Sequence, residues 1–384
     1  MLLAFTVVVF GAYVRLTAAG LGCPDWPGCY GHVTPLGAED SIVSGASLAG
    51  PPLDVGKAWR EMIHRYLAGA LVLLIVLMAA LSCTQRFSRL RRRYAFTLLA
   101  TIVAQAALGM LTVRWQLKPL IVTLHLVIGL STLSLVWLLW LTLRSEGRGV
   151  ERSRGAERRN VAGGTERPAR ILATFALVTV AAQITLGGWT SSNYAAIACP
   201  DFPRCQGSWW PAMDGHAAFV LWRTPTVNYE GGLLSLAARS AIHFTHRLGA
   251  AAAACVLLLA ALYVLCQRRL RPMHAAAIFV VLALALQLTI GISMVLRGFP
   301  LWLAAAHNAG AALTLLAVVT LVYRANELVP QSVRVPRRSD SRGTFAIPAA
   351  EPIPRAAMAR ANGFAAEVAG VATGSTAHGP TSFN

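Results

Sequence analysis

Four histidines lie near the starts of apolar segments, and their spacing repeats along the chain. His125 follows His64 by 61 residues, and His307 follows His246 by the same interval. The interval indicates two copies of one unit. An imidazole costs free energy in hydrocarbon unless a ligand uses it. We therefore interpret the four side chains as paired ligands of buried metal centres.

One position close to these histidines differs between the two copies. Glu61 lies three residues before His64, whereas His243 lies three residues before His246. Side chains three residues apart share a helix face. We therefore predict that Glu61 is the catalytic carboxylate of the first copy. His243 is kept as a secondary residue that either caps the helix entrance or hydrogen-bonds a ligand.

Composition indicates a membrane protein. Hydrophobic residues make up 56% of the 384 residues, and charged residues only 13%. This balance is far from that of a soluble domain. A net charge of +18 would suggest a nucleic-acid partner in a soluble chain. Here the arginines lie in loops between apolar runs, so the positive charge is explained by the orientation of the chain in the membrane. No nucleic-acid partner is expected.

The apolar runs predict an all-α integral membrane protein with eight transmembrane helices, arranged as two pseudo-symmetric four-helix bundles. The predicted spans are approximately 1–14, 62–82, 94–113, 119–143, 170–190, 239–266, 273–296 and 301–323. The first run is short for the roughly 20 residues of a span, which leaves room for a start upstream of Met1. No positive charge precedes it, and it has a counterpart in the second half, so we predict a helix rather than a signal peptide.

Arginine placement predicts the orientation. The loops at 84–93, 144–170 and 267–272 are rich in arginine, whereas the intervening loops hold few for their length. By the positive-inside rule these loops and both termini are cytoplasmic. The four histidines then begin spans that run from outside to inside, toward the outer half of the membrane.

The repeat divides the chain into four segments. Residues 1–143 form the N-terminal half and residues 170–323 the C-terminal half. Between them, residues 144–169 are predicted to be a cytoplasmic basic linker. Residues 324–384 have no apolar pattern, and we predict a disordered cytoplasmic tail.

Polar and small residues inside the spans also repeat. Gln105 and Gly109 recur 182 residues later as Gln287 and Gly291. A glutamine in a membrane helix usually finds a hydrogen bond across helices, and a glycine allows close packing. We interpret both pairs as structural.

Two cysteine pairs stand at one spacing in the predicted outer loops, Cys23 with Cys29 and Cys199 with Cys205. In an oxidising compartment this pattern predicts a disulfide in each loop, with proline and aspartate shaping the turn. A redox-active thiol pair or a copper site remains as an alternative.

Paired histidines on two helices of one bundle match bis-histidine haem ligation. Non-haem iron or copper would need a carboxylate or a third nitrogen nearby, and only Glu61 and His243 are at hand. Arg65 and Arg247 directly follow histidines, and we predict that they contact haem propionates. Snorkelling to the interface is the alternative for both arginines.

These residues, with Arg15-Leu16-Thr17 and the Cys-Pro-Asp-Trp-Pro loop that follows it, resemble those of the haem A synthase family. The resemblance covers about residues 1–323. It implies an eight-helix pseudo-twofold fold and an oxidoreductase that converts the C8 methyl group of haem O to a formyl group, giving haem A for terminal oxidases. The clipped first helix and the long tail depart from the family pattern.

The resemblance also assigns roles to the residues above. It implies that His246 and His307 hold a resident haem b, while His64 and His125 receive the substrate haem O. The family's essential carboxylate falls on Glu61. Its loop cysteines fall on Cys23, Cys29, Cys199 and Cys205.

A bacterial plasma membrane location is expected for such a protein, with haem O synthase and the terminal oxidase assembly machinery as candidate partners. Two other functions remain open. A dihaem b-type transmembrane electron carrier would place its haems near opposite faces of the membrane. A noncatalytic haem or oxidase assembly protein would not need the difference between Glu61 and His243.

Overall fold

The computed structural model describes residues 1–37, 54–84, 88–152, 164–222 and 227–328. These residues form helices and no β-strand, so the predicted all-α class is confirmed for them. The longer helices are α1 (Leu2–Leu16), α3 (Val55–Thr84), α4 (Arg89–Arg114), α5 (Pro119–Arg152), α6 (Glu166–Ser192), α8 (Leu236–Cys266), α9 (Arg271–Leu296) and α10 (Leu301–Leu328). The short elements are η1 (Pro35–Gly37), η3 (Ala196–Ala198), α7 (Gly215–Ala218) and η4 (Arg268–Leu270).

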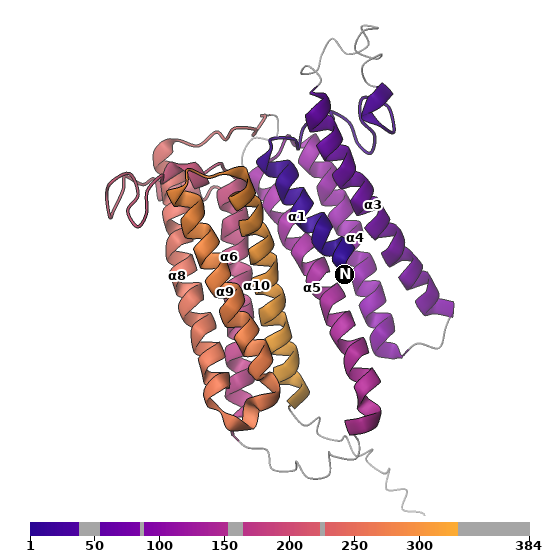
Figure 1. Cartoon of the computed structure of the whole chain (residues 1–384). Coiled ribbons are helices and arrows are strands. Elements are labelled where there is room, and N and C mark those ends of the chain that lie inside the picture. The colour runs from indigo at the N-terminus through magenta and orange to yellow at the C-terminus, as the bar shows by residue number, and fades with distance from the viewer. Residues whose placement is uncertain (38–53, 85–87, 153–163, 223–226, 329–384) are drawn as a thin grey trace, which may run out of the picture. The chain divides into compact units, whose positions relative to one another are not determined.

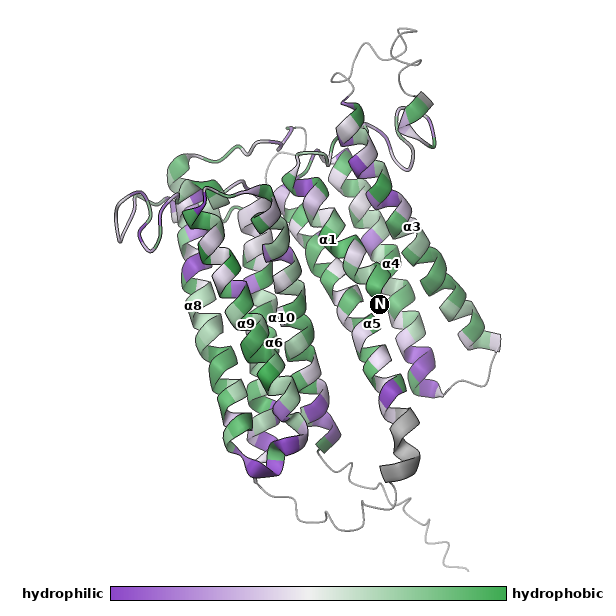
Figure 2. Ribbon diagram, viewed as in Figure 1, coloured by the Kyte–Doolittle hydropathy of each residue, from purple (hydrophilic) through white to green (hydrophobic). Residues whose placement is uncertain are grey.

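Seven of the helices in the described part of the chain are long and apolar enough to cross a membrane. They are α3, α4, α5, α6, α8, α9 and α10, and α1 is a shorter apolar helix of 15 residues. Figure 2 shows hydrophobic residues along the middle of these helices and hydrophilic residues gathered at their ends. The chain is therefore a multi-pass membrane protein, as its composition predicts.

Each of the eight longer helices in the described residues extends past its predicted span at one end or both, and two of them reach into the predicted linker. α5 continues to Arg152 and α6 begins at Glu166, so helix occupies both ends of the range 144–169 predicted as a linker. Arginine and glutamate favour helix, so these ends continue past the apolar stretch. The rest of that range, residues 153–163, lies outside the described residues, as does the predicted tail from residue 329 onward.

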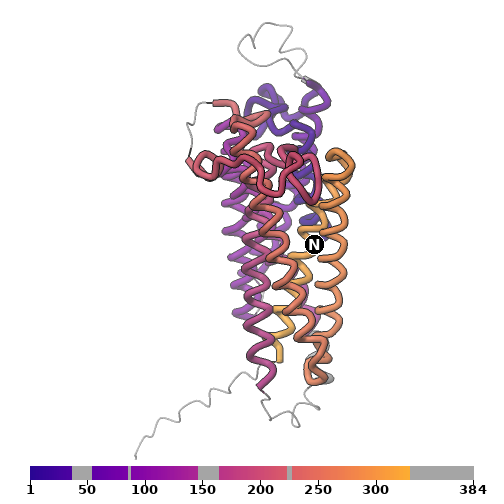
Figure 3. Tube along the Cα trace, turned by 90° about the vertical axis from the view of Figure 1, so that its left-hand side faces the viewer, coloured from indigo at the N-terminus to yellow at the C-terminus, as the bar shows by residue number. Residues whose placement is uncertain are grey.

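Local sequence sets where the histidine-bearing helices begin. Pro119 begins α5, at a position where its missing N–H costs no helical hydrogen bond. Ser235 caps α8, because its side chain accepts a hydrogen bond from Ala238 N at 3.3 Å. Pro300 directly precedes α10. His64, His125, His246 and His307 lie in the N-terminal parts of α3, α5, α8 and α10. These helices begin at the end of the molecule where the disulfide loops lie (Figures 1 and 3).

The helices pack through small residues and a shared core. Figure 1 shows α6, α8, α9 and α10 side by side, with α1, α3, α4 and α5 beside one another. α6 also contacts α5, and α10 contacts both α5 and α1. Ala173, Ala176, Ala261 and Ala277 are almost fully buried, so backbones approach closely at these points.

Polar contacts join residues from the two halves within the helices and at the disulfide-loop end. Trp137 Nε1 donates to Thr320 Oγ1 at 2.8 Å. At the disulfide-loop end, Tyr229 N donates to the carbonyl oxygen of Gln116 at 3.0 Å. The loop before α8 therefore reaches the first half of the chain.

Candidate functional site

Both predicted disulfides are present, Cys23 with Cys29 and Cys199 with Cys205. All four cysteines are buried. In each loop an aspartate organises the turn. Asp25 Oδ1 and Oδ2 accept hydrogen bonds from Tyr30 N and Gly31 N at 2.6 and 2.9 Å, and Asp201 makes the two equivalent bonds at the same distances.

The second of these aspartates is tuned by its loop. Burial alone raises the pKa of the Asp201 carboxyl, but the N–H groups of Gly207 and Gln206 bring this pKa below its usual value. Hydrogen bonds to the ionised form have this effect. The carboxylate is therefore part of the loop's structure at neutral pH.

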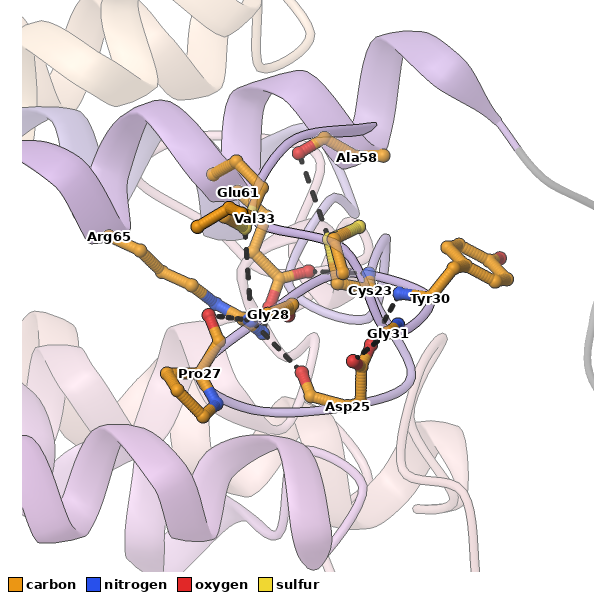
Figure 4. Close-up of a disulfide and its surroundings, with 12 residues drawn as sticks. Cys23, Asp25, Pro27, Gly28, Tyr30, Gly31, Val33, Ala58, Glu61 and Arg65 are labelled. Atoms are coloured by element: carbon orange, nitrogen blue, oxygen red, sulfur yellow. Dashed lines mark hydrogen bonds and ion pairs between the residues drawn. A yellow bond between two sulfur atoms is a disulfide. The ribbon is translucent and has the colours of Figure 1, made fainter. Parts of the chain in front are cut away.

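Glu61 is attached to the first disulfide loop (Figure 4). The residue is only 5% exposed, and Oε2 accepts a hydrogen bond from Cys23 N at 2.9 Å. Oε1 pairs with Arg65, one helical turn further along α3. Gly22 makes this approach possible, because a Cβ atom there would lie 2.6 Å from the carbonyl carbon of Lys57. The loop thus fixes both oxygens of the predicted catalytic carboxylate.

Arg65 binds the loop as well as Glu61. Its Nη1 donates to the carbonyl oxygens of Asp25 at 2.9 Å and Pro27 at 3.2 Å, and also to that of Gly28. In Figure 4 the guanidinium points into the turn of the loop. Most of its donors are therefore used within the protein.

Arg247 repeats this arrangement in the second half. Its Nη1 donates to Arg204 O at 2.7 Å, and its Nη2 to Cys199 O at 3.0 Å and Asp201 O at 2.8 Å. Its Nε donates to Nε2 of His243 at 3.3 Å. His243, only 4% exposed, thus replaces Glu61 as the partner of the arginine. The carboxylate is found only in the first of these two equivalent positions.

Each of the four histidines packs against a glycine of a neighbouring helix. If the glycine carried a Cβ atom, the distance from that atom to Cε1 of the histidine would be short in every case. It would be 2.7 Å for Gly11 and His64, 3.3 Å for Gly109 and His125, 3.1 Å for Gly187 and His246, and 2.9 Å for Gly291 and His307. Any larger residue would push on the imidazole, since carbon atoms pack at about 3.5–4.0 Å. Sequence reasoning assigned Gly109 and Gly291 only to helix packing and gave no role to Gly11 or Gly187. Both glycine pairs repeat between the two halves of the chain, on the long helix that precedes each histidine. This repetition in the sequence could have indicated that the glycines belong to the histidine sites.

Three of the histidines also contact a glutamine. The distances between the glutamine Nε2 and a ring nitrogen are 3.2 Å for Gln105 and His125, 3.1 Å for Gln183 and His246, and 3.2 Å for Gln287 and His307. The cross-helix hydrogen bonds predicted for Gln105 and Gln287 are therefore present, and their partners are the candidate metal ligands themselves. Gln183 was missed because its repeat position holds a different residue.

His64 lacks such a partner. The repeat position of Gln183 is Val7, and that of Gly249 is Leu67. These two changes belong together, because a Cβ atom on Gly249 would collide with the Gln183 amide oxygen. Nδ1 of His64 is buried without a hydrogen-bond partner among the described residues. The two halves therefore differ at one ligand as well as at the carboxylate.

His246 and His307 line one cavity of about 660 Å³, within the usual range of ligand pockets. Its other lining side chains are mostly apolar. In the first half, His64 packs on Gly11 of α1 and His125 packs on Gly109 of α4. Among the described residues, no group of three or more His, Cys, Asp or Glu could hold a metal ion. Two histidines that pack on glycines in an apolar cavity fit a haem, which His246 and His307 would hold.

The fold and the site define a duplicated, multi-pass helical membrane protein with paired histidines suited to haem. A family model described as "Cytochrome oxidase assembly protein" matches residues 1–319, and the chain belongs to this family. The resemblance to haem A synthases seen in the sequence is thereby confirmed.

Three curated relatives of this chain share the same name. A protein named "Heme A synthase" from Shewanella oneidensis is 42% identical over 329 residues, which cover 84% of this chain and 93% of the relative. The protein of that name from Methylobacterium radiotolerans is 28% identical over 361 residues, covering 87% of this chain and 90% of the relative. The protein of the same name from Halalkalibacterium halodurans is 27% identical over 309 residues, covering 78% of this chain and 86% of the relative.

Proposed function

We propose that this chain is a haem A synthase, an oxidoreductase that converts the C8 methyl group of haem O to a formyl group. The curated name of its relatives supports this function. The structural observation that carries it is the difference between two equivalent positions. Glu61 and His243 each hold an arginine that binds a disulfide loop, but only Glu61 can accept a proton as a carboxylate.

The two histidine pairs divide the binding roles. His246 and His307 would hold a resident haem b, and each of these imidazoles has a glutamine partner that restrains its ring. Haem b bound there would supply electron transfer. His64 and His125 would receive haem O. The lack of a glutamine at His64 suits a site whose ligand must enter and leave.

Glu61 is the group that handles protons. Each of two successive oxidations of the methyl group removes two electrons and two protons and adds the oxygen of one water molecule, and the electrons pass to an electron acceptor outside this chain. The hydrated aldehyde then loses water to give the formyl group. Glu61 accepts a proton or orients the water, while Cys23 N and Arg65 fix the direction of its two oxygens. The disulfide loop above it restricts access of bulk water to this carboxylate.

We further propose the topology predicted from the sequence. In that topology α1 is the eighth span, the helices form two four-helix bundles, and the arginine-rich loops and both termini are cytoplasmic. The expected location is a bacterial plasma membrane. Haem O synthase and the terminal oxidase assembly machinery remain candidate partners. Contact of Arg65 and Arg247 with propionates remains a prediction, and both side chains have most of their donors engaged by loop carbonyls.

Pigment analysis tests the function against its two competitors. The full chain is produced in cells that make haem O but contain no other source of haem A, and the extracted haems are separated by chromatography. A haem A synthase yields haem A. Cells that contain only haem O and haem b would show that the chain is an electron carrier or a noncatalytic assembly protein.

A further inference from the structure

The first half of the chain completes the cavity that contains His246 and His307. Besides α6, α8, α9 and α10, its walls include residues of α1 and α5. Among the described residues that line it, Arg15 and Arg247 are charged and none is a carboxylate. Cations beside an apolar cavity without an acid are costly. The lining is therefore complementary to a ligand that carries negative charge.

The two arginines differ in how many donors they leave for such a ligand. Arg247 donates to His243 and to three loop carbonyls, so at most one N–H remains. Arg15 donates once, from Nη2 to Ser191 O at 2.9 Å, and its Nε is buried without a partner in the described part of the chain. Its guanidinium carbon lies 4.1 Å from the centroid of the Tyr194 ring.

Tyr194 adds a second unused donor at the same place. Its buried hydroxyl oxygen lies where it can accept from Arg15, but its own O–H has no acceptor among the described residues. Both side chains line the cavity. Leaving buried donors unsatisfied costs free energy, so the pair indicates a missing acceptor. Glu230 acts electrostatically on Arg15 but is itself paired with Lys57, with 3.6 Å between Oε1 and Nζ.

The repeat shows that this cation belongs to only one of the two halves. The position equivalent to Arg15 in the second half is Ser191, 176 residues later, and Arg15 reaches across to the carbonyl of that same residue. A side chain of α1 thus lies against the second-half cavity, although α1 belongs to the first half.

We propose that Arg15, with Tyr194 beside it, binds a carboxylate of the porphyrin held between His246 and His307. Arg15 is then a positioning residue, and the first half completes the cofactor site of the second. The inference rests on the proposed haem b site and adds to it a requirement for the ligand's negative charge.

Haem loading with a neutral analogue tests this charge requirement. The full chain is produced in haem-deficient cells and loaded with haem b or with haem b dimethyl ester, and transfer to a haem-scavenging acceptor is followed by absorbance. Wild-type protein should lose the ester about tenfold faster than haem b, because a charge-assisted hydrogen bond is lost. Arg15→Gln should lose haem b faster and so narrow its difference from the ester, and Arg15→Lys should keep more of the difference.

Arg144→Gln is the matched control, since Arg144 stacks on Trp140 of α5 and is not among the cavity-lining residues. It should behave as wild type. The proposal is overturned if Arg15→Gln discriminates the ester as strongly as wild type does. If Arg15→Gln fails to fold, Tyr194→Phe decides, with a reduced difference expected and an unchanged difference contradicting the proposal.

The same experiment separates this inference from the proposed function. A wild-type chain that takes up no haem, or a His246→Ala and His307→Ala double variant that keeps its full haem content, would refute the haem site itself. Intact haem binding with unaltered ester discrimination in Arg15→Gln would refute only the role of Arg15.

Discussion

Replacing Gly291 by alanine should weaken the proposed haem b site without disturbing the fold. Gly291 lies in α9, where alanine is a better helix former than glycine. The new Cβ atom would lie 2.9 Å from His307 Cε1. To reach ordinary contact at about 3.5 Å, the imidazole must retreat by about 0.6 Å.

The cost of this retreat can be bounded. Overpacking of a closely packed site typically costs about 1–3 kcal/mol. If this free energy destabilises only the haem-bound state, haem b affinity falls by about 5-fold to about 140-fold. The effect should appear as faster transfer of haem b to an acceptor protein and as a weakened low-spin spectrum, because the displaced His307 would hold the haem less well.

Gly69→Ala provides the control. Gly69 also lies inside a membrane helix, α3, but a Cβ atom there meets nothing within 4 Å. This variant should retain the wild-type rate of haem transfer. The reasoning would be refuted if Gly291→Ala released haem b at the wild-type rate with an unchanged spectrum, or if Gly69→Ala lost haem as readily.

Three further substitutions separate the two halves. Gly11→Ala should raise the KM for haem O about tenfold and leave haem b content unchanged; an unchanged KM in purified enzyme would contradict the packing seen in the first half. Gln183→Leu removes the side-chain partner of His246 and should speed haem b loss about 10-fold to 100-fold, whereas a wild-type rate would show that the contact does not restrain the ring. Arg65→Gln breaks the pair with Glu61 and frees the loop, so thermal unfolding should begin at lower temperature and activity should fall. Arg65→Lys should restore little of either, since lysine cannot reproduce the forked geometry of the guanidinium, and full restoration by lysine would contradict this role of the guanidinium.

The sequence predicted the features that depend on local pattern and on duplication. Apolar runs longer than 18 residues gave the membrane helices, and repeated spacing gave the disulfides in both loops. The difference between Glu61 and His243 was also visible, because it is a change of residue type at one repeat position.

Features that depend on three-dimensional contact could not be predicted in this way. Nothing local shows that an arginine binds loop carbonyls, so the contacts of Arg65 with the disulfide loop could not be predicted, whereas its contact with a propionate stays a prediction. Arg15 was noted only as part of a motif, since its reach across to Ser191 depends on how α1 meets α6. The ends of α5 and α6 extend into the predicted linker because polar residues that favour helix continue each helix beyond its apolar stretch.

The proposed role of Glu61 is proton chemistry in a site that the second half lacks. This role is tested most directly by measuring haem A formed per molecule of purified protein in wild type and in Glu61→Gln, which keeps the shape and the hydrogen bond from Cys23 N but cannot accept a proton as a carboxylate does. Glu61→Gln should hold wild-type amounts of haem b and form haem A at least about 100-fold more slowly. Formation of haem A by this variant at the wild-type rate would show that Glu61 does not have this role.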